Sequence, residues 1–322
     1  KQLDPHQRKI IQAAERLGIN ITPLQSTLQI DAIELSYQGQ KEIVTLGRVF
    51  SHLNAIADQV AANKVASKTL MKALGIPVPP EVLLDVKHLD EIVIEQFLFN
   101  HPLVVVKPLI GTDGIGIAMH LRTRENICNH IEAFAHLGHQ WILEAQVKGE
   151  DLRLQYLNGE IVAACVRKPC FIVGNGQDSI QSLIDHRNEL IQTQNPDNFI
   201  AVDHQVKRRL ALAEFDLTTV LKKGYELQLK DVSNMAQGGH AIDISHKVHP
   251  HYLNYLDALA NSLHIRVLSL DVMTDSPELD PAQHATALEF NARPAWLHHT
   301  FSEGKQHDIP TLILKDLFQI KS

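Results

Sequence analysis

The stretch from residue 151 to residue 168 constrains the fold of this chain most strongly. Two runs rich in apolar residues, 152–157 and 160–167, flank the dipeptide Asn158-Gly159. Asn-Gly readily adopts the positive φ angles of a two-residue turn between antiparallel strands. The stretch therefore predicts an antiparallel hairpin, which argues against a strict alternation of strands and helices around a parallel sheet.

The rest of the chain mixes helices with short strands. Apolar residues recur at helical spacing over 6–17, 53–74 (as one or two helices), 85–100, 124–137, 179–193, 206–222, 250–264 and 309–318. Strands are expected in a hairpin within 28–50 and over 103–108, 117–121, 141–144, 225–229, 266–273 and 285–291. The sequence thus predicts the α+β class.

Composition excludes several classes of protein. A formal charge of −7 gives no basic surface for nucleic acid or for an anionic membrane. Cys128, Cys165 and Cys170 are too few for a disulfide framework and favour a reducing compartment. No apolar run approaches the ~20 residues of a membrane span, and the first residues carry no apolar signal core. We expect a cytoplasmic protein without nucleic-acid or membrane partners.

A glycine-rich loop follows the apolar run that ends in Lys107. Its sequence, GTDGIG at 111–116, does not match the dinucleotide-binding pattern G-x-G-x-x-G, and a strand rather than a helix is expected after it. Small residues let backbone N–H groups approach an anion, and the lysine supplies positive charge. The loop fits a phosphate site, although a plain connection between two strands is the simpler interpretation of this loop alone.

Three polar residues interrupt the expected strands near the C-terminus. Strand alternation places Glu289 and Asn291 on one face, and Asp271 lies in the middle of an apolar strand. A carboxylate is costly there unless it is paired or bound to a metal. Such oxygen ligands suit Mg²⁺, while exposed faces of edge strands are the alternative.

Single basic residues lie on other expected strands. Arg153, Arg167 and Lys107 are either solvated side chains or parts of a polyphosphate clamp.

The histidines cluster without a zinc motif. The groups are His136/His139, His246/His249/His251 and His298-His299, and none lies in an H-E-x-x-H or paired C-x-x-C context. We therefore expect surface or core histidines. Cys165 and Cys170 have no histidine partner nearby in the sequence and are expected in the core. Ser302-Glu303-Gly304 is no nucleophile elbow, so a serine hydrolase has little support.

The order of these pieces resembles the ATP-grasp superfamily of carboxylate–amine ligases, most closely the ATP-grasp regions of cyanophycin synthetase and bifunctional glutathione synthetase. The resemblance runs from about residue 35 to the end. The matching stretches are AIADQVAANKVASKTLMKALGIPVP, VVVKPLIGTDGIGIAMHL, LEAQVKGEDLRLQYLNGEIVAACVRKP, FIVGNGQDSIQSLIDHRN, SNMAQGGHAIDISHKVHP, and LDVMTD followed by ALEFNARP and FSEGK.

This resemblance implies a role for each matching residue. ATP contacts are implied for Lys64 and Lys107 (phosphates), Gly111, Gly114 and Gly116 (small loop), Glu144 and Val147 (adenine and ribose hinge) and Asp151 (ribose). Catalytic roles fall to Arg153 and Arg167 at the transferred phosphate, with Asn291 and Arg293. Two Mg²⁺ ions, with Mn²⁺ as an alternative, would be held by Asp271, Glu289 and Asn291. The large mobile loop, 234–240, includes Asn234, Gly238 and Gly239, while Arg293 and Lys305 would lie near the substrate.

The implied fold holds the nucleotide between two α+β subdomains with antiparallel sheets. We expect a lead region over 1–62, a lid subdomain over 63–145 and a C-terminal subdomain over 146–322. The implied activity is ATP-dependent amide or peptide bond formation between amino acids or short peptides through an acyl-phosphate. A homodimer is also implied.

The sequence departs from the family in two ways. Neither a second, P-loop-bearing site nor a glutamate–cysteine ligase module is present in these residues, so one bond per cycle is expected. The family's Asn-Ala-Ala/Arg-Pro-Gly reads Asn-Ala-Arg-Pro-Ala-Trp at 291–296, which alters the expected acceptor pocket. A catalytically silent nucleotide-binding module or partner subunit is the alternative function, and a carboxylase or acyl-CoA ligase ranks below it.

Overall fold

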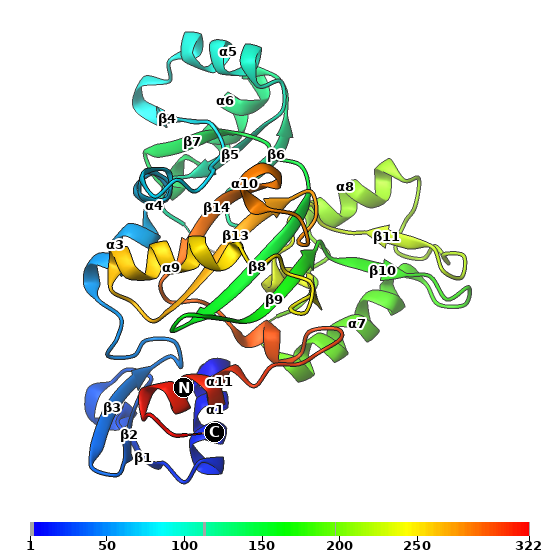
Figure 1. Cartoon of the computed structure of the whole chain (residues 1–322). Helices are drawn as coiled ribbons and strands as arrows, with labels where there is room; N and C mark the ends of the chain where they lie inside the picture. The colour runs from blue at the N-terminus through cyan, green and yellow to red at the C-terminus, as the bar shows by residue number, and fades with distance from the viewer. Residues whose placement is uncertain (1–2, 112–113, 197, 322) are drawn as a thin grey trace.

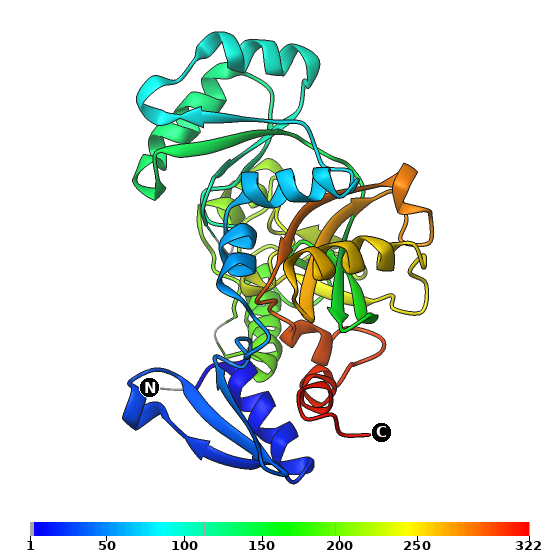
Figure 2. The same cartoon turned by 60° about the vertical axis from the view of Figure 1, so that its left-hand side comes forward.

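The part of the chain that the structure describes folds around four sheets, each with its own apolar cluster (Figures 1 and 2). The structure is a computed structural model that describes residues 3–111, 114–196 and 198–321. Thr112 and Asp113 of the GTDGIG loop therefore lie outside the described residues. Within the described part, no helix is both long enough and apolar enough to span a bilayer.

A three-stranded sheet forms the N-terminal part. It contains β1 (Asn20–Pro23), β2 (Ala32–Tyr37) and β3 (Gln40–Thr45). Helices α1 (Pro5–Arg16) and α11 (Ile309–Leu317) pack against one another beside it, so both ends of the chain lie together (Figure 1). A short helix, α2 (Gln25–Leu28), connects β1 to β2.

The second sheet is antiparallel, in the order β4–β7–β5–β6. Its strands are β4 (Glu81–Asp85), β5 (Val104–Pro108), β6 (Ala118–Leu121) and β7 (Gln140–Ala145). Two helices, α5 (Glu91–Asn100) and α6 (Arg124–Ala133), cover it, with the short helices η1 (Val86–His88) and η2 (Ala135–Leu137) beside them. Figure 1 shows this lobe at the top.

Two helices join the first two sheets. They are α3 (Ala55–Ala62) and α4 (Lys64–Ala73), and both contact the central sheet. The break between them falls at Asn63, whose side-chain Oδ1 accepts hydrogen bonds from the N–H groups of Val65 and Ala66 at 3.1 Å. This N-cap makes Lys64 the first residue of α4.

The central sheet has five antiparallel strands in the order β12–β9–β8–β13–β14. They are β8 (Glu150–Leu157), β9 (Glu160–Lys168), β12 (His240–Asp243), β13 (Val267–Thr274) and β14 (Ala285–Asn291). The hairpin predicted at Asn158-Gly159 is β8–β9, and that prediction is confirmed. Helix α9 (Tyr252–Leu263) packs on one face, and α10 (Pro281–His284) precedes β14.

A fourth unit carries a two-stranded sheet. It contains β10 (Phe171–Val173), α7 (Ile180–Gln194), α8 (His204–Leu212) and β11 (Glu226–Gln228). Two single-turn helices, η3 (Met235–Gln237) and η4 (Leu297–Thr300), lie near the central sheet. The prediction of a helix over 206–222 is wrong beyond Leu212, because Glu214 adopts a positive φ of 57° and turns the chain.

A β-bulge sets which side chains of β14 face each side of the central sheet. Asp271 pairs with Glu289, whereas the next residue, Val272, pairs with Ala287, so Leu288 is the extra residue. Ala285, Ala287 and Phe290 consequently all join the core under α9. Because directly opposed residues share a face, Glu289 and Asn291 lie on the other face, with Asp271 and Ser269.

Candidate active site

The face of the central sheet opposite α9 carries a row of charged residues. Register places Arg153 between Cys165 and Asp271, and Asp271 next to Glu289. Arg167 and Asp151 form the neighbouring pair on the same face. Four strands thus bring together residues that are up to 138 positions apart in the sequence.

Two arginines and two aspartates form what we call the arginine cluster: Arg153, Arg167, Asp151 and Asp271. Arg153 Nη1 donates to both carboxylate oxygens of Asp271, at 2.9 and 3.0 Å. Arg167 donates to Asp151 at 2.6 Å and lies 3.2 Å from the second oxygen of Asp271. The buried Asp271 carboxylate is therefore paired, as its place in a strand requires.

The pKa values in this cluster reflect burial and pairing together. Burial raises the pKa of Asp151, and the nearby Asp271 carboxylate adds to the effect, although Arg167 opposes it. Burial would lower the pKa of Arg167, but Asp151 and Asp271 raise it above its usual value. The guanidinium group of Arg167 therefore stays charged.

A second group, the lysine cluster, joins α4 to the second sheet and contains Lys64, Lys68, Lys107, Glu81 and Glu144. Lys107 Nζ lies 2.9 Å from one oxygen of Glu144 and 2.8 Å from the other. Lys68 binds the same carboxylate and also Glu81, the latter at 2.5 Å. Lys64 donates to the carbonyl of Gly111 at 2.9 Å, which ties α4 to the glycine-rich loop.

The charges of the lysine cluster support one another. Burial would raise the pKa of Glu144, but Lys107 and Lys68 together hold it below its usual value. Burial would lower the pKa of Lys68, but Glu144 and Glu81 raise it. Burial lowers the pKa of Lys64, with Glu289 opposing that effect and Lys107 adding to it. Lys64 therefore interacts electrostatically with Glu289 on β14 as well as with the other lysines.

Two of the three predicted metal ligands have side chains without a hydrogen-bond partner among the described residues. The Glu289 carboxylate makes no hydrogen bond or ion pair there, and the buried side-chain Nδ2 of Asn291 has no hydrogen-bond partner. Carboxylate and amide oxygens are the donors that Mg²⁺ prefers. Asp271, Glu289 and Asn291 therefore fit a magnesium site, with Asp271 shared between that site and Arg153.

The two loops singled out in the sequence approach one another. A Cβ atom on Gly114 would lie 3.6 Å from Val232 and 3.7 Å from the side chain of Asn234. Gly239 packs against the 234–240 loop itself, where a Cβ would lie 2.8 Å from the Asn234 carbonyl oxygen. The glycines thus permit close contact between the small loop and the large loop.

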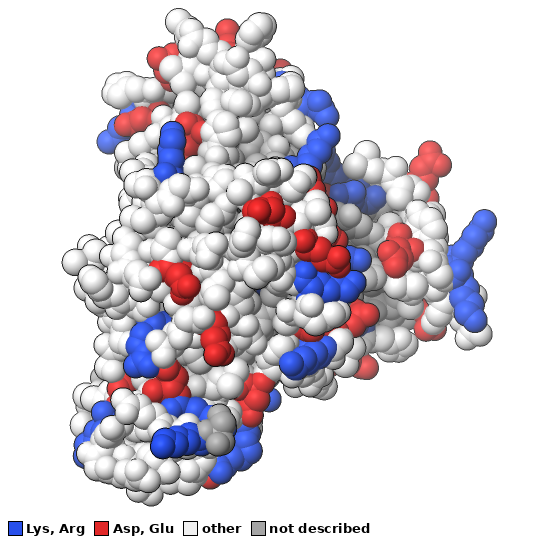
Figure 3. Space-filling view, in the orientation of Figure 1, with Lys and Arg blue, Asp and Glu red and all other residues white. Residues whose placement is uncertain are grey.

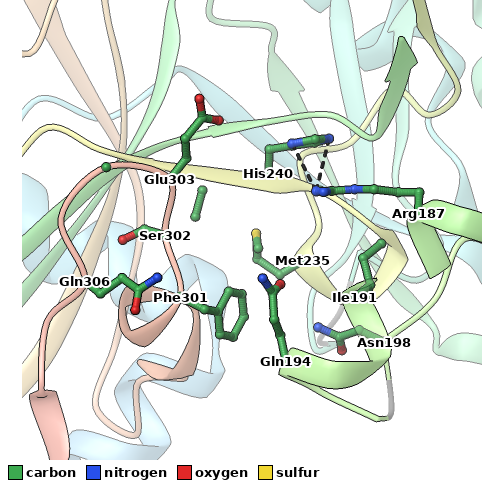
Figure 4. A pocket seen from close by; sticks show the side chains of 13 residues that line it. Arg187, Ile191, Gln194, Asn198, Met235, His240, Phe301, Ser302, Glu303 and Gln306 are labelled. Carbon is green, nitrogen blue, oxygen red and sulfur yellow. Dashed lines mark hydrogen bonds between the residues drawn. The ribbon is translucent and has the colours of Figure 1, made fainter. Parts of the chain in front are cut away.

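A cavity of about 360 Å³ lies between α7, the large loop and the segment after η4 (Figure 4). Its wall includes Arg187, Gln194, His240, Glu303 and Gln306. Arg187 reaches His240, with its Nη2 at 3.1 Å from Nδ1, and His240 stacks on Phe171. Ala241, also in the wall, pairs with Arg167, so the cavity adjoins the arginine cluster. Figure 3 shows a recess on the outer face, between the α5–α6 lobe and the α8–β11 unit, with both charges along it.

Some predicted residues lie apart from these two clusters. Arg293 forms an ion pair with Asp58 on α3, with Nε 2.6 Å from Oδ1. Lys305 is exposed between the cavity residues Gly304 and Gln306, and Val147 lies half-buried between β7 and β8. Gly238 and Gly239 are in the turn before β12, and Gly116 packs against Pro108 and Trp141.

The sequence interpretation missed several residues. Lys68 gave a signal, since it falls four positions after Lys64 on the same helix face. Arg187, His240 and Glu303 lie within stretches that carried the resemblance, but no individual role was predicted for them. Cys165, expected in the core, is buried, but it lies beside His298 and His299 and so does have histidine partners. Burial lowers the pKa of both histidines well below its usual value and raises that of Cys165 to about 12.

Sequence comparisons find known proteins that are similar to this chain. Residues 61–171 match the RimK-like ATP-grasp domain. Cyanophycin synthetase of Trichormus variabilis is 26% identical over 98% of this chain and 35% of its own length. The glutathione biosynthesis bifunctional protein GshAB of Pasteurella multocida is 24% identical over 88% of this chain and 39% of its own length. The chain therefore spans about a third of the length of the curated relatives that it matches.

A solved structure shows the same fold over nearly the whole chain. The bifunctional glutathione synthetase from Pasteurella multocida superposes with a TM-score of 0.71 at 22% identity, covering 99% of this chain and 44% of that one.

Proposed function

We propose that this chain, which has the ATP-grasp fold, is an ATP-dependent ligase. It would join the carboxyl group of an amino acid or short peptide to an amine and release ADP and phosphate. One observation carries the proposal: Lys64 belongs to a lysine cluster with excess positive charge, and it lies near enough to Glu289, one of the carboxylates that we propose as cation ligands, for that carboxylate to oppose the lowering of its pKa. A nucleotide triphosphate with its cation needs these two environments side by side.

The lysine cluster is assigned to the phosphates. Lys64 and Lys107 would contact them, and Gly111, Gly114 and Gly116 would bring backbone N–H groups over them. Because the carboxylate of Glu144 is held by Lys68 and Lys107, we assign its side chain to positioning these lysines. The adenine and ribose would then lie along the backbone from Glu144 to Val147 and near Asp151.

The polar face of the central sheet, opposite α9, is assigned to the cation. Two Mg²⁺ ions, or Mn²⁺ in their place, would be held by Asp271, Glu289 and Asn291 and would neutralise charge on the phosphates. The substrate carboxylate attacks the γ-phosphorus, so that an acyl-phosphate forms and ADP leaves. The amine then attacks the acyl carbon, loses a proton and expels phosphate. Arg153 and Arg167 would stabilise the negative charge of the transferred group.

The cavity beside the arginine cluster is proposed as the site of the amino acid or peptide. Its volume is near the lower end of the range for small-ligand pockets. Arg187 offers a cation for a carboxylate, and Glu303 offers a carboxylate for an ammonium group. We place Arg293 and Lys305 at its margin, and the loop 234–240 as its cover, with closure excluding water from the acyl-phosphate.

The division of the chain remains a proposal as well. We propose a lead region over 1–62, a lid subdomain over 63–145 and a C-terminal subdomain over 146–322. We also propose a homodimer, which light scattering can test.

The first test is phosphate release from ATP and Mg²⁺ against a panel of amino acids and dipeptides. We expect stimulation by particular substrates, loss of it in Glu289→Ala, and no loss in Glu278→Ala, whose side chain is exposed and paired only with Lys247. No ATP binding at all would overturn the proposal. One observation favours a catalytically silent module: the Asp271 carboxylate already forms ion pairs with two arginines, Arg153 and Arg167. ATP binding without stimulated release would support that alternative.

A further inference from the structure

Three side chains that bind soft metals meet beneath the central sheet. Cys165 projects from β9, and His298 and His299 come from η4, which packs against that strand. The sulfur atom of Cys165 and one ring nitrogen of each histidine all lie within 4.8 Å of one another. Cys165 and His299 are fully buried, and His298 is only 6% exposed.

The two imidazoles lack the hydrogen bonds that buried rings require. Nε2 of His298 and both ring nitrogens of His299 have no partner among the described residues. Buried polar groups in proteins are almost always paired, so three unpartnered nitrogens in one place indicate a missing ligand. Cys165 supplies a sulfur atom at the same point.

The chemistry of these atoms selects the ion. One thiolate and two neutral imidazoles form a set that suits Zn²⁺, whereas Mg²⁺ prefers oxygen. We propose that Cys165, His298 and His299 bind one Zn²⁺ ion, with a water molecule in the fourth position. Binding forms a sulfur–zinc bond, and the thiol proton passes to solvent.

The surrounding charges permit a cation there. Arg153 and Arg167 lie close to the cluster, but each is paired with Asp271 or Asp151. The thiolate therefore adds a negative charge to a balanced environment.

The ion would act as a clamp on the substrate side of the sheet. It would tie β9 to η4, and the residues around η4 include Ala295, whose carbonyl oxygen accepts a hydrogen bond from Arg153 at 3.5 Å. Phe301 to Gln306, which form one wall of the cavity, follow η4 directly. The proposed zinc site thus stabilises the wall and the arginine cluster without touching the substrate.

A second group of potential metal ligands must be distinguished from the first in any experiment. His249, His251 and Asp280 also lie within 4.8 Å, but His251 is exposed and already paired with Asp280 at 3.0 Å. This group has no sulfur atom, so a metal bound there produces no thiolate signal.

The test uses the full chain, stripped of metal by a chelator and titrated with Co²⁺ as a spectroscopic probe. We expect one equivalent to give a thiolate-to-cobalt charge-transfer band with the visible bands of four-coordinate cobalt, both bleached by Zn²⁺. Cys165→Ser should lose the charge-transfer band, and its Zn²⁺ affinity should fall by at least about 100-fold. Cys170→Ser is the matched control, since Cys170 is equally buried but outside the cluster.

Two further measurements make the outcome decisive. Zn²⁺ should raise the unfolding temperature of the unsubstituted chain, and His251→Gln should leave both this rise and the cobalt spectrum unchanged. Cobalt binding without a charge-transfer band, or a band that persists in Cys165→Ser, would overturn the proposal. If the unsubstituted chain shows neither bound metal nor a temperature shift, the cluster is no zinc site, however the variants fold.

Discussion

The lysine cluster and the arginine cluster bury comparable numbers of charges but balance them differently. The lysine cluster holds three cations against two carboxylates, which leaves an excess of positive charge. The arginine cluster holds two cations against two carboxylates, and Glu289 beside it adds a negative charge. The excess positive charge of the lysine cluster would therefore be balanced by an anion, and the excess negative charge beside the arginine cluster by a cation.

The two clusters also differ in the kind of cationic side chain that they contain. Lysine ammonium groups are point charges on flexible stems, so Lys107 and Lys64 can turn from Glu144 and Gly111 toward a phosphate. Guanidinium groups form fixed forks, such as that of Arg153 on both oxygens of Asp271. We infer that the lysine cluster rearranges on binding nucleotide and that the arginine cluster keeps its geometry.

The largest effect should come from Asp271→Asn. Removing one member of a buried, paired group typically costs about 3–5 kcal/mol, here because two guanidinium groups would face a single carboxylate. The variant should unfold at lower urea concentration, and stimulated phosphate release should fall at least ~100-fold. Asp275→Asn is the control, because its exposed carboxylate contacts only His284. Unchanged stability in Asp271→Asn would mean that the cluster is not held by its own charges.

Lys107→Met should separate binding from stability. Lys68 still neutralises Glu144 in this variant, so the free energy of unfolding should fall by only about 1 kcal/mol, while ATP affinity falls ~100-fold. Lys68→Met should be the less stable of the two, because Lys68 is paired with both Glu81 and Glu144, whereas Lys107 is paired with Glu144. Calorimetric titration with ATP measures the affinity, and unfolding by urea measures the free energy of unfolding. If Lys107→Met proves less stable than Lys68→Met, Lys107 rather than Lys68 holds the lysine cluster together, and the prediction is wrong.

The two clusters should respond to acid with opposite signs. The pKa of Glu144 is lowered in the folded chain, so the unfolded chain takes up its proton first as the pH falls, and stability is lost below the usual glutamate pKa. The pKa of Asp151 is raised, so the folded chain takes up its proton first, and acid favours folding at this group. Each unit of pKa shift corresponds to about 1.4 kcal/mol.

Unfolding free energies between pH 7 and pH 3.5 test this difference. Glu144→Gln should weaken the loss of stability on acidification, and Asp151→Asn should strengthen it. The slope against pH is the quantity compared, because each variant also changes the stability at pH 7. Equal slopes in both variants would contradict the assignment.

Local sequence signals predicted much of the fold. The Asn158-Gly159 hairpin, the helix at the N-terminus and the strand over 285–291 are confirmed. The strands β1, β4, β10 and β12 were not predicted. Three of these have three or four residues, too few to show a period, and their partners lie elsewhere in the chain.

The arrangement of the site depended on long-range pairing. Strand alternation placed Glu289 with Asn291, but only the bulge at Leu288 explains how Ala285, Ala287 and Phe290 can all be buried on the other side. Bulges arise from the fit between strands, so the sequence of one strand does not reveal them. Cys165 and His299 likewise meet across 134 residues through the packing of η4 on β9, which no spacing motif records.

The smallest effect concerns the small glycine-rich loop, which Lys64 contacts at Gly111. Gly114 has a φ of 72°, and a Cβ atom there would make only ordinary contacts with Val232 and Asn234. Gly114→Ala should therefore cost about 1 kcal/mol from backbone strain alone. Gly39→Ala is the matched control, because Gly39 has a φ of 84° with nothing within 4 Å, in the β2–β3 turn. Both variants should lose similar thermal stability, but only Gly114→Ala should weaken ATP binding, by less than about 10-fold. If Gly114→Ala binds ATP as Gly39→Ala does, the small loop does not contact the phosphates, and the lysine cluster alone must account for their binding.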